Sequence, residues 1–280
     1  MRIDEALRDA ARRLELAGIA EPRREASSLL SFALGKPHAF LIAHPEYQIT
    51  DQQQATFDEI VTRREAREPF QYITGKQEFW GLEFTVAPGV LIPRPETELL
   101  VEAAIEHLQK LDKPTFVEAC VGSGCISVSI LHSLQNARAI ATDISPLAID
   151  MTRRNATLHG VDNRLELRET DLLDGIESRV DLILANPPYI PDGDIAGLQA
   201  EVRNFEPREA LAGGRDGLDI IRRLIGEAGH ILVDGGVLLM EIGAGQATAV
   251  ADLFDSDKWG SPEFRRDLQA IPRVVTAVRR

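Results

Sequence analysis

The motif Asn-Pro-Pro-Tyr at residues 186–189 contains residue types that can bind and orient a polar ligand. It directly follows the apolar run 180–185, which predicts a buried strand, so the motif stands where that strand leaves its sheet. The two prolines lack backbone donors and hold the chain extended, which leaves the Asn186 side chain and the Pro187 carbonyl free to face a ligand. The motif therefore offers two acceptors to the N–H groups of a planar amine, although Asn-Pro is also a common turn signal.

A glycine-containing loop is the second candidate site. Residues 118–124 read Glu-Ala-Cys-Val-Gly-Ser-Gly and lie between a predicted strand and a predicted helix. Glycines there let the backbone approach a ligand at the carboxyl edge of a sheet. The pattern alone fits a dinucleotide, an adenosyl group or a tight turn, but a nicotinamide site would favour G-x-G-x-x-G, and residues 122–127 end in serine.

Two aspartates follow neighbouring predicted strands. Asp143 stands 19 residues after Gly124, where a carboxylate can accept hydrogen bonds from both hydroxyls of a ribose. Asp171 is placed to accept from the exocyclic amine of an adenine, with Leu172 packing on the ring, and its alternative role is that of a capping or turn residue. Together with the glycine loop, these acids favour an adenosyl ligand.

Such a ligand would give the Asn-Pro-Pro-Tyr motif a reaction. A planar amine conjugated to a carbonyl or a ring is a weak nucleophile, because its lone pair is delocalised. If Asn186 and the Pro187 carbonyl accept its N–H bonds, electron density rises on that nitrogen as it attacks a methyl sulfonium. The Tyr189 ring would cover the flat group and fix the direction of attack.

The elements expected to position these residues lie in the second part of the chain. From residue 114 strands alternate with helices, which predicts a mostly parallel sheet covered on both faces. The two last segments, 263–269 and 273–278, are expected to pair as an antiparallel hairpin at the sheet edge. The remaining strands are expected at residues 115–119, 138–142, 165–168, 180–185 and 237–242.

The first 95 residues predict two different structures. Apolar residues recur at helical spacing up to Pro69, which predicts a small helical bundle with a recognition or docking role. From Phe70 to Val86 the pattern has period two, which predicts a β-hairpin. We therefore predict a helical substrate-recognition domain at 1–69, a hairpin linker at 70–95 and a catalytic domain at 96–280. Within the proline-rich stretch 92–98, Arg94 and Glu96 either line a ligand site or belong to a rigid connector.

Composition limits the class of protein. The 280 residues are 44% hydrophobic, as in ordinary globular proteins, and contain two cysteines and no apolar run near 18 residues. With the charged N-terminus, this predicts a cytoplasmic protein without a disulfide scaffold or membrane partner. The net charge of −13 disfavours direct nucleic-acid binding, which depends on cationic contacts.

Further motifs stand at residues 72–75, 78–82, 92–98, 206–208, 210–211 and 213–217. With residues 186–189, they make nearly the whole chain resemble the release-factor glutamine N5-methyltransferases (PrmC/HemK family). The resemblance implies an α/β fold with the Rossmann-like sheet of class I methyltransferases, which has seven strands and is mostly parallel. It also implies that this sheet follows an N-terminal helical domain that helps to hold the substrate. It also implies S-adenosyl-L-methionine as donor, S-adenosyl-L-homocysteine as product, and the glutamine N5 of the Gly-Gly-Gln motif in class I peptide chain release factors as acceptor.

The resemblance also assigns site residues. It implies a donor site formed by Cys120, Val121, Gly122, Ser123, Gly124, Asp143, Asp171, Leu172 and Asn186. It implies a substrate-amide site formed by Asn186, Pro187, Pro188 and Tyr189, of which Asn186, Pro187 and Tyr189 are catalytic. The family usually reads D-x-G-x-G-x-G in the first loop, whereas this chain has Glu118 for the aspartate and Cys120 for the first glycine. Glu118 keeps the charge on a longer arm, and Cys120 adds a side chain where an unusual backbone angle is often needed.

The same residues allow three other interpretations. Adenine N6 in a nucleic acid poses the same chemical problem, but its methylation would require base flipping and a cationic groove. A non-catalytic adenosyl-binding module is disfavoured by the intact motif at 186–189. A metal or redox site at Cys120 and Cys125 is disfavoured because no Cys or His ligands flank them, and no metal is expected.

Overall fold

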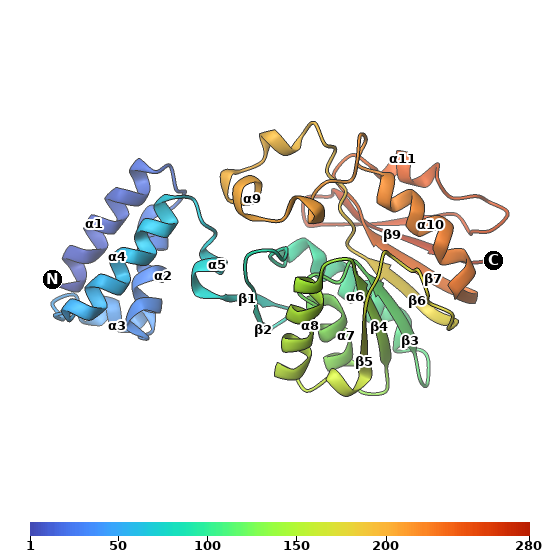
Figure 1. Cartoon of the computed structure of the whole chain (residues 1–280), viewed down its shortest axis with the longest axis horizontal. Coiled ribbons are helices and arrows are strands. Elements are labelled where there is room, and N and C mark those ends of the chain that lie inside the picture. Colours follow the sequence, from blue (N-terminus) through green and yellow to red (C-terminus); the bar gives the residue numbers. More distant parts are fainter. The chain divides into compact units, whose positions relative to one another are not determined.

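The computed structural model describes residues 1–280, and the chain divides into two compact units (Figure 1). The helical unit comprises Met1–Gly75 together with Gln199–Phe205. The mixed unit comprises Lys76–Leu198 and Glu206–Arg280. A segment from the second half of the sequence therefore belongs to the N-terminal unit.

The helical unit confirms the predicted bundle. The first helix buries an apolar stripe that includes Ile3, Ala10 and Leu14. This stripe packs against the second and fourth helices. Thr50 opens the fourth helix as a capping box, accepting from the Gln53 backbone N–H at 3.2 Å. The helices are α1 (Ile3–Leu16), α2 (Pro22–Leu34), α3 (His38–Ala43), α4 (Asp51–Glu65) and α5 (Phe70–Thr74).

The predicted hairpin begins later than expected. Phe70–Thr74 forms helix α5, because Pro69 precedes its first turn and Gly75, at φ +73°, ends it in the left-handed conformation. The prediction of strand from Phe70 was therefore wrong for this segment. The hairpin itself pairs β1 (Lys76–Phe79) with β2 (Leu82–Thr85) in the mixed unit.

The distant segment of the helical unit is held by an ion-pair network. Helix α9 (Ala200–Phe205) carries Glu201, whose two carboxylate oxygens accept from Arg64 at 3.0 Å and from Arg67 at 2.7 Å. Arg64 is buried and also donates to Glu25 at 3.0 Å. Three parts of the sequence thus share one charge cluster within this unit.

The mixed unit is built on a seven-stranded sheet, which confirms the predicted fold class. Its strand order is β5-β4-β3-β6-β7-β9-β8, parallel from β5 to β7, and the antiparallel pair β8 and β9 lies at the edge as predicted. The strands are β3 (Thr115–Ala119), β4 (Arg138–Asp143), β5 (Leu165–Glu169), β6 (Val180–Ala185), β7 (Leu232–Glu241), β8 (Glu263–Arg266) and β9 (Pro272–Val278). The α-helices of this unit are α6 (Glu98–Leu108), α7 (Cys125–Ser133), α8 (Pro146–Leu158), α10 (Asp219–Ile231) and α11 (Ala247–Ala251), and the 3₁₀ turns are η1 (Pro95–Thr97), η2 (Asp162–Arg164), η3 (Ile195–Gly197) and η4 (Arg208–Ala210).

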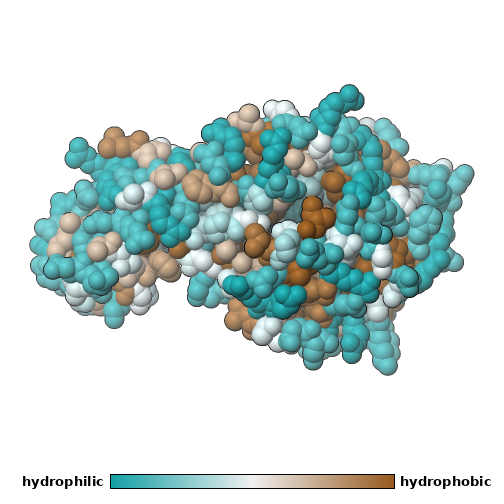
Figure 2. All heavy atoms as spheres, in the orientation of Figure 1, coloured by the Kyte–Doolittle hydropathy of each residue, from teal (hydrophilic) through white to brown (hydrophobic).

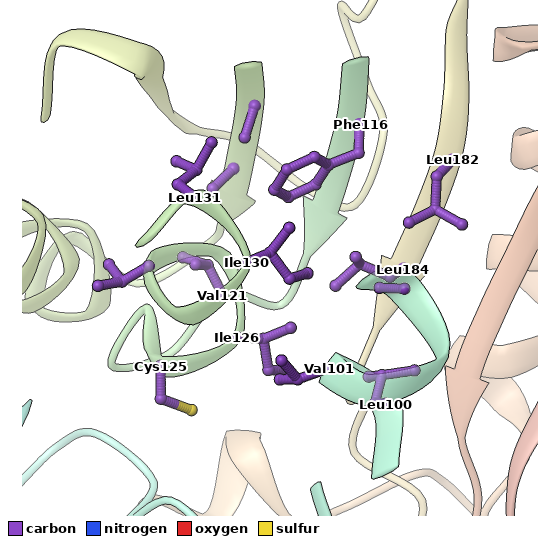
Figure 3. Packing of buried hydrophobic residues seen from close by; sticks show 14 of the residues in the cluster. Leu100, Val101, Phe116, Val121, Cys125, Ile126, Ile130, Leu131, Leu182 and Leu184 are labelled. Atoms are coloured by element: carbon purple, nitrogen blue, oxygen red, sulfur yellow. The ribbon is translucent and has the colours of Figure 1, made fainter. Parts of the chain in front are cut away.

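Both faces of this sheet are buried, which explains the near-continuous apolar strands. Phe116, Leu182 and Leu184 pack with residues of α6 and α7 on one face, as Figure 3 shows, and α8 adds to the same cluster. The alternate residues Val117 and Ile183 pack with α10 on the other. Strand pairing sets the register of the central strands, and the two layers of helices bury both of their faces.

The face of the molecule in Figure 2 is mostly hydrophilic, with some hydrophobic residues gathered near the middle of the mixed unit. None of the helices combines the length and the apolar character needed to span a membrane.

Candidate active site

A cavity of about 480 Å³ in the mixed unit gathers most of the predicted site residues. It lies at the carboxyl ends of β3, β4 and β6, the edge at which open α/β sheets bind ligands. Of the predicted site residues, the cavity wall contains Cys120, Val121, Gly122, Ser123, Asp143, Asp171, Leu172, Asn186 and Pro188. Gly124, Pro187 and Tyr189 are not on this wall.

Strand register explains why the glycine loop and the Asn-Pro-Pro-Tyr motif meet. The last residue of β3, Ala119, pairs with the last residue of β6, Ala185. Cys120 and Asn186 therefore start two adjacent loops on the same edge. The strand order reverses between β3 and β6, so the cavity lies at the topological switch point of the sheet.

The glycine loop turns sharply through left-handed backbone. Cys120, Gly122 and Gly124 have φ angles of +59°, +57° and +79°. The predicted need for an unusual backbone angle at Cys120 is thus confirmed, and a non-glycine residue there costs about 1–2 kcal/mol of local strain. A Cβ on Gly122 would meet no protein atom within 4 Å, so this turn leaves room beside its backbone.

Two buried residues of α8 that sequence reasoning missed hold this loop. The Asn155 amide donates to the carbonyls of Ser123 at 2.9 Å and Thr85 at 3.0 Å, and accepts from the Thr85 N–H at 2.8 Å. Thr152 donates to the Gly122 carbonyl at 3.0 Å. A Cβ at Gly124 would lie 2.7 Å from the Thr152 methyl group, so this glycine permits close packing rather than ligand contact.

Glu118 lies beneath the loop and is not on the cavity wall. Its carboxyl accepts from the Ser127 N–H at 2.8 Å and from the Ser127 hydroxyl, so it caps the start of α7, where Gly124 offers no side chain. Burial raises the pKa of Glu118 to about 8, and its second oxygen has no partner. The acid therefore positions the loop from below.

The two aspartates differ in their surroundings. Asp143 ends β4 and accepts from the N–H groups of Gly122 at 3.0 Å and Ser145 at 2.9 Å, while burial raises its pKa. Asp171 is exposed and accepts from Arg223 at 3.0 Å. Leu172 has φ +48°, and its carbonyl accepts from Thr142 at 2.6 Å. Both predicted adenine-side residues nevertheless line the cavity.

The Asn-Pro-Pro-Tyr motif presents only part of itself to the cavity. Asn186 and Pro188 line it, whereas Pro187 is buried. The Tyr189 hydroxyl donates to buried Glu241 at 3.1 Å, and burial raises the pKa of that hydroxyl. The hydrogen bond to Glu241 thus fixes the tyrosine ring, and the sequence of the motif alone did not indicate this contact.

The glycine-rich stretch 213–217 supports this motif from outside. A Cβ on Gly213 would lie 2.7 Å from the Pro188 carbonyl oxygen, and a Cβ on Gly217 would overlap the Tyr189 carbonyl oxygen. Gln246 donates to the same Tyr189 carbonyl at 2.9 Å. Only glycine permits this close approach of two backbones.

The proline-rich stretch 92–98 resolves into a cavity wall. Pro93, Arg94 and Thr97 line it, whereas Glu96 is exposed and does not. The stretch therefore lines the cavity through Arg94, and Glu96 fits the alternative of a connector with a solvated charge. Arg94 donates to both oxygens of buried Glu206 at 2.6 and 2.8 Å. This pair joins two stretches that flank the cavity.

Burial raises the pKa of both cysteine thiols well above their usual range. A thiol that stays protonated is a poor nucleophile and a poor metal ligand. The redox and metal interpretations therefore gain no support from these side chains.

The cavity fits an adenosyl donor by its chemistry. Its walls are mainly apolar, as expected for the face of an adenine, and the half-buried carboxylate of Asp143 stands at the end of β4. Because no protein atom lies within 4 Å of the Cβ position of Gly122, a ligand can approach the backbone closely there.

Solved structures share this architecture. The chain superimposes on a methyltransferase of Pyrococcus furiosus with a TM-score of 0.51 and 14% identity, covering 79% of this chain and 96% of that one. A 16S rRNA methyltransferase of T. thermophilus, solved with AdoMet and guanosine, gives a TM-score of 0.53 and 17% identity, covering 73% and 50%. The fold is that of the Rossmann-like methyltransferases.

Sequence comparison is more specific. The PrmC N-terminal domain matches residues 5–75, and the methyltransferase small domain matches residues 95–201. Proteins called release factor glutamine methyltransferase are 39% identical over 277 residues in Koribacter versatilis, covering 98% of each chain, and 43% over 254 residues in Moorella thermoacetica, covering 90% of this chain and 89% of that one. The chain belongs to the release factor glutamine methyltransferase family. This confirms the predicted resemblance and favours the main functional interpretation over adenine methylation.

Proposed function

We propose that this protein transfers a methyl group from S-adenosyl-L-methionine to the side-chain amide nitrogen of a glutamine in class I peptide release factors. One observation carries the proposal. The paired ends of β3 and β6 bring the glycine loop and Asn186 onto the wall of one cavity, in a chain of this family.

The donor supplies an electrophilic methyl group when bound. Asp143 would accept from its ribose hydroxyls, Asp171 and Leu172 would lie beside the adenine, and residues 120–123 would pass along its length. Asn186 Oδ1 and the Pro187 carbonyl would accept the two N–H bonds of the glutamine amide. They would thereby orient its nitrogen and raise its electron density.

The helical unit has no catalytic motif, and we assign it to recognition of the release factor. The segment between β6 and β7 supports this role. It carries Asn186 and Pro188 on the cavity wall, and its residues 199–205 belong to the helical unit. The predicted division into recognition domain, linker and catalytic domain stays a prediction.

Radiolabelled S-adenosyl-L-methionine, offered with a class I release factor or with a DNA duplex, tests the proposal. We expect label only on the release factor, and mass spectrometry should place the methyl group on the glutamine of its Gly-Gly-Gln motif. Label on DNA alone would overturn the proposal in favour of adenine methylation.

Replacing Cys120 by glycine is expected to preserve or tighten donor binding. Glycine adopts the φ of +59° without strain, so the loop geometry that faces the donor is kept. The strain of about 1–2 kcal/mol that is removed, partly offset by about 0.5–1 kcal/mol of added chain entropy, changes the free energy of unfolding rather than the donor affinity. Calorimetric Kd values for S-adenosyl-L-methionine measure the effect. Cys120→Ala is the matched control, because it keeps the Cβ and hence the strain. A large loss of affinity in both variants would show that the thiol itself is required, whereas a large loss in Cys120→Gly alone would contradict the prediction and assign the effect to the Cβ.

A further inference from the structure

Two buried residues that were not predicted as site residues are linked to Asn186, and one of them, Thr97, also lies on the cavity wall. Thr97, in η1, and Glu241, at the end of β7, are each 2% exposed. The Asn186 Nδ2 donates to Thr97 Oγ1 at 3.2 Å, and Thr97 Oγ1 donates to Glu241 Oε2 at 2.7 Å. The other Glu241 oxygen accepts from the Tyr189 hydroxyl at 3.1 Å. One carboxylate thus reaches both ends of the Asn-Pro-Pro-Tyr motif.

The direction of these hydrogen bonds fixes the Asn186 amide. A threonine hydroxyl has one proton, and here that proton is committed to Glu241 Oε2. Burial raises the pKa of Glu241, and a proton on Oε1, the oxygen that faces Tyr189, leaves Oε2 free to accept from Thr97. Toward Asn186 the Thr97 oxygen can therefore only accept, so the NH₂ group of Asn186 must face Thr97. The Asn186 oxygen then lies at the other end of the planar amide, away from Thr97. Rotating the amide by half a turn would place two acceptors against each other and would present a donor to the substrate.

We propose that Thr97 and Glu241 are positioning residues that hold the Asn186 amide in the orientation that accepts from the substrate nitrogen. This inference rests on the proposed function, because it assumes that Asn186 Oδ1 accepts an N–H of the glutamine. Glu241 has a second effect, since its contact with Tyr189 ties the far end of the motif to the same carboxylate. The family motif at 92–98 thereby gains a specific task at Thr97.

The experiment compares Thr97→Val, which keeps the shape and removes the hydroxyl, with Thr97→Ser, which keeps the hydroxyl. Steady-state kinetics with a release factor should show kcat lower by about 10²-fold in Thr97→Val, as expected when a reacting group is misoriented, with the KM for donor near the wild-type value. Thr97→Ser should recover most of that loss. Equal losses in both variants, or an unchanged kcat in Thr97→Val, would overturn the inference.

A double-mutant cycle separates positioning from general packing. If Thr97 acts through Asn186, adding Thr97→Val to Asn186→Ala should cost little beyond Asn186→Ala alone. Additive losses would contradict the inference. Should Thr97→Val fail to fold, Thr97→Ala removes the same hydroxyl and takes its place in both comparisons. Wild-type protein that methylates no release factor would refute the proposed function instead, so the two failures are distinguishable.

Discussion

Replacing Asn186 by alanine is expected to lower kcat for glutamine methylation by about 10²–10³-fold, the usual cost of losing one preorganised polar partner of a reacting group. The Kd for S-adenosyl-L-methionine should stay close to the wild-type value, because the loop at 120–123 and Asp143 remain in place. The substitution would remove only the Asn186 oxygen that accepts an N–H of the glutamine amide. Labelled-donor kinetics and calorimetry measure the two quantities separately.

Asn163→Ala is the matched control for this variant. Asn163 is exposed and precedes β5, at the amino edge of the parallel strands and away from the cavity. Its removal should leave both kcat and Kd unchanged. An Asn186→Ala enzyme with normal kcat would refute the amide-polarising role. A loss of donor affinity as large as the loss of kcat would instead assign Asn186 to the donor.

Local patterns in the sequence were sufficient to predict the sheet and the cavity edge. Parallel strands buried on both faces must be apolar along their length, so Thr115–Ala119 and Val180–Ala185 were predicted with their observed bounds. Because loops after such strands share one edge, the glycine loop and Asn186 were expected to meet there. Glycines and prolines marked the turns through their backbone restrictions.

Local sequence patterns could not predict contacts between residues that are far apart in the sequence. Thr97 and Glu241 are 144 positions apart, and neither has a neighbour in sequence that indicates the contact. Asn155 reaches Thr85 across 70 positions for the same reason. The Tyr189 ring was expected to cover the substrate, but its direction depends on a carboxylate on another strand. Helix α5 was missed because five residues are too few to distinguish helical from strand periodicity.

Glu118→Gln is expected to change the pH dependence of stability. In the folded protein the Glu118 pKa is about 8, against an ordinary value of 4.5. Between these pH values the unfolded chain releases the proton while the folded protein keeps it. The free energy of unfolding therefore falls as pH rises, by up to about 1.4 kcal/mol per pH unit from this group. Below and above that window the group contributes no slope.

Glutamine imitates the protonated acid, because its oxygen can accept from Ser127 while its NH₂ group takes the place of the carboxyl O–H. The variant should therefore lack the decline and exceed wild type in stability at pH 8, with little difference at pH 5. Urea unfolding at both pH values measures this. Glu169→Gln, on an exposed residue of β5, should retain the decline of the wild type. If Glu118→Gln also retains it, another group titrates in this range, and the buried acid beneath the glycine loop is not its source.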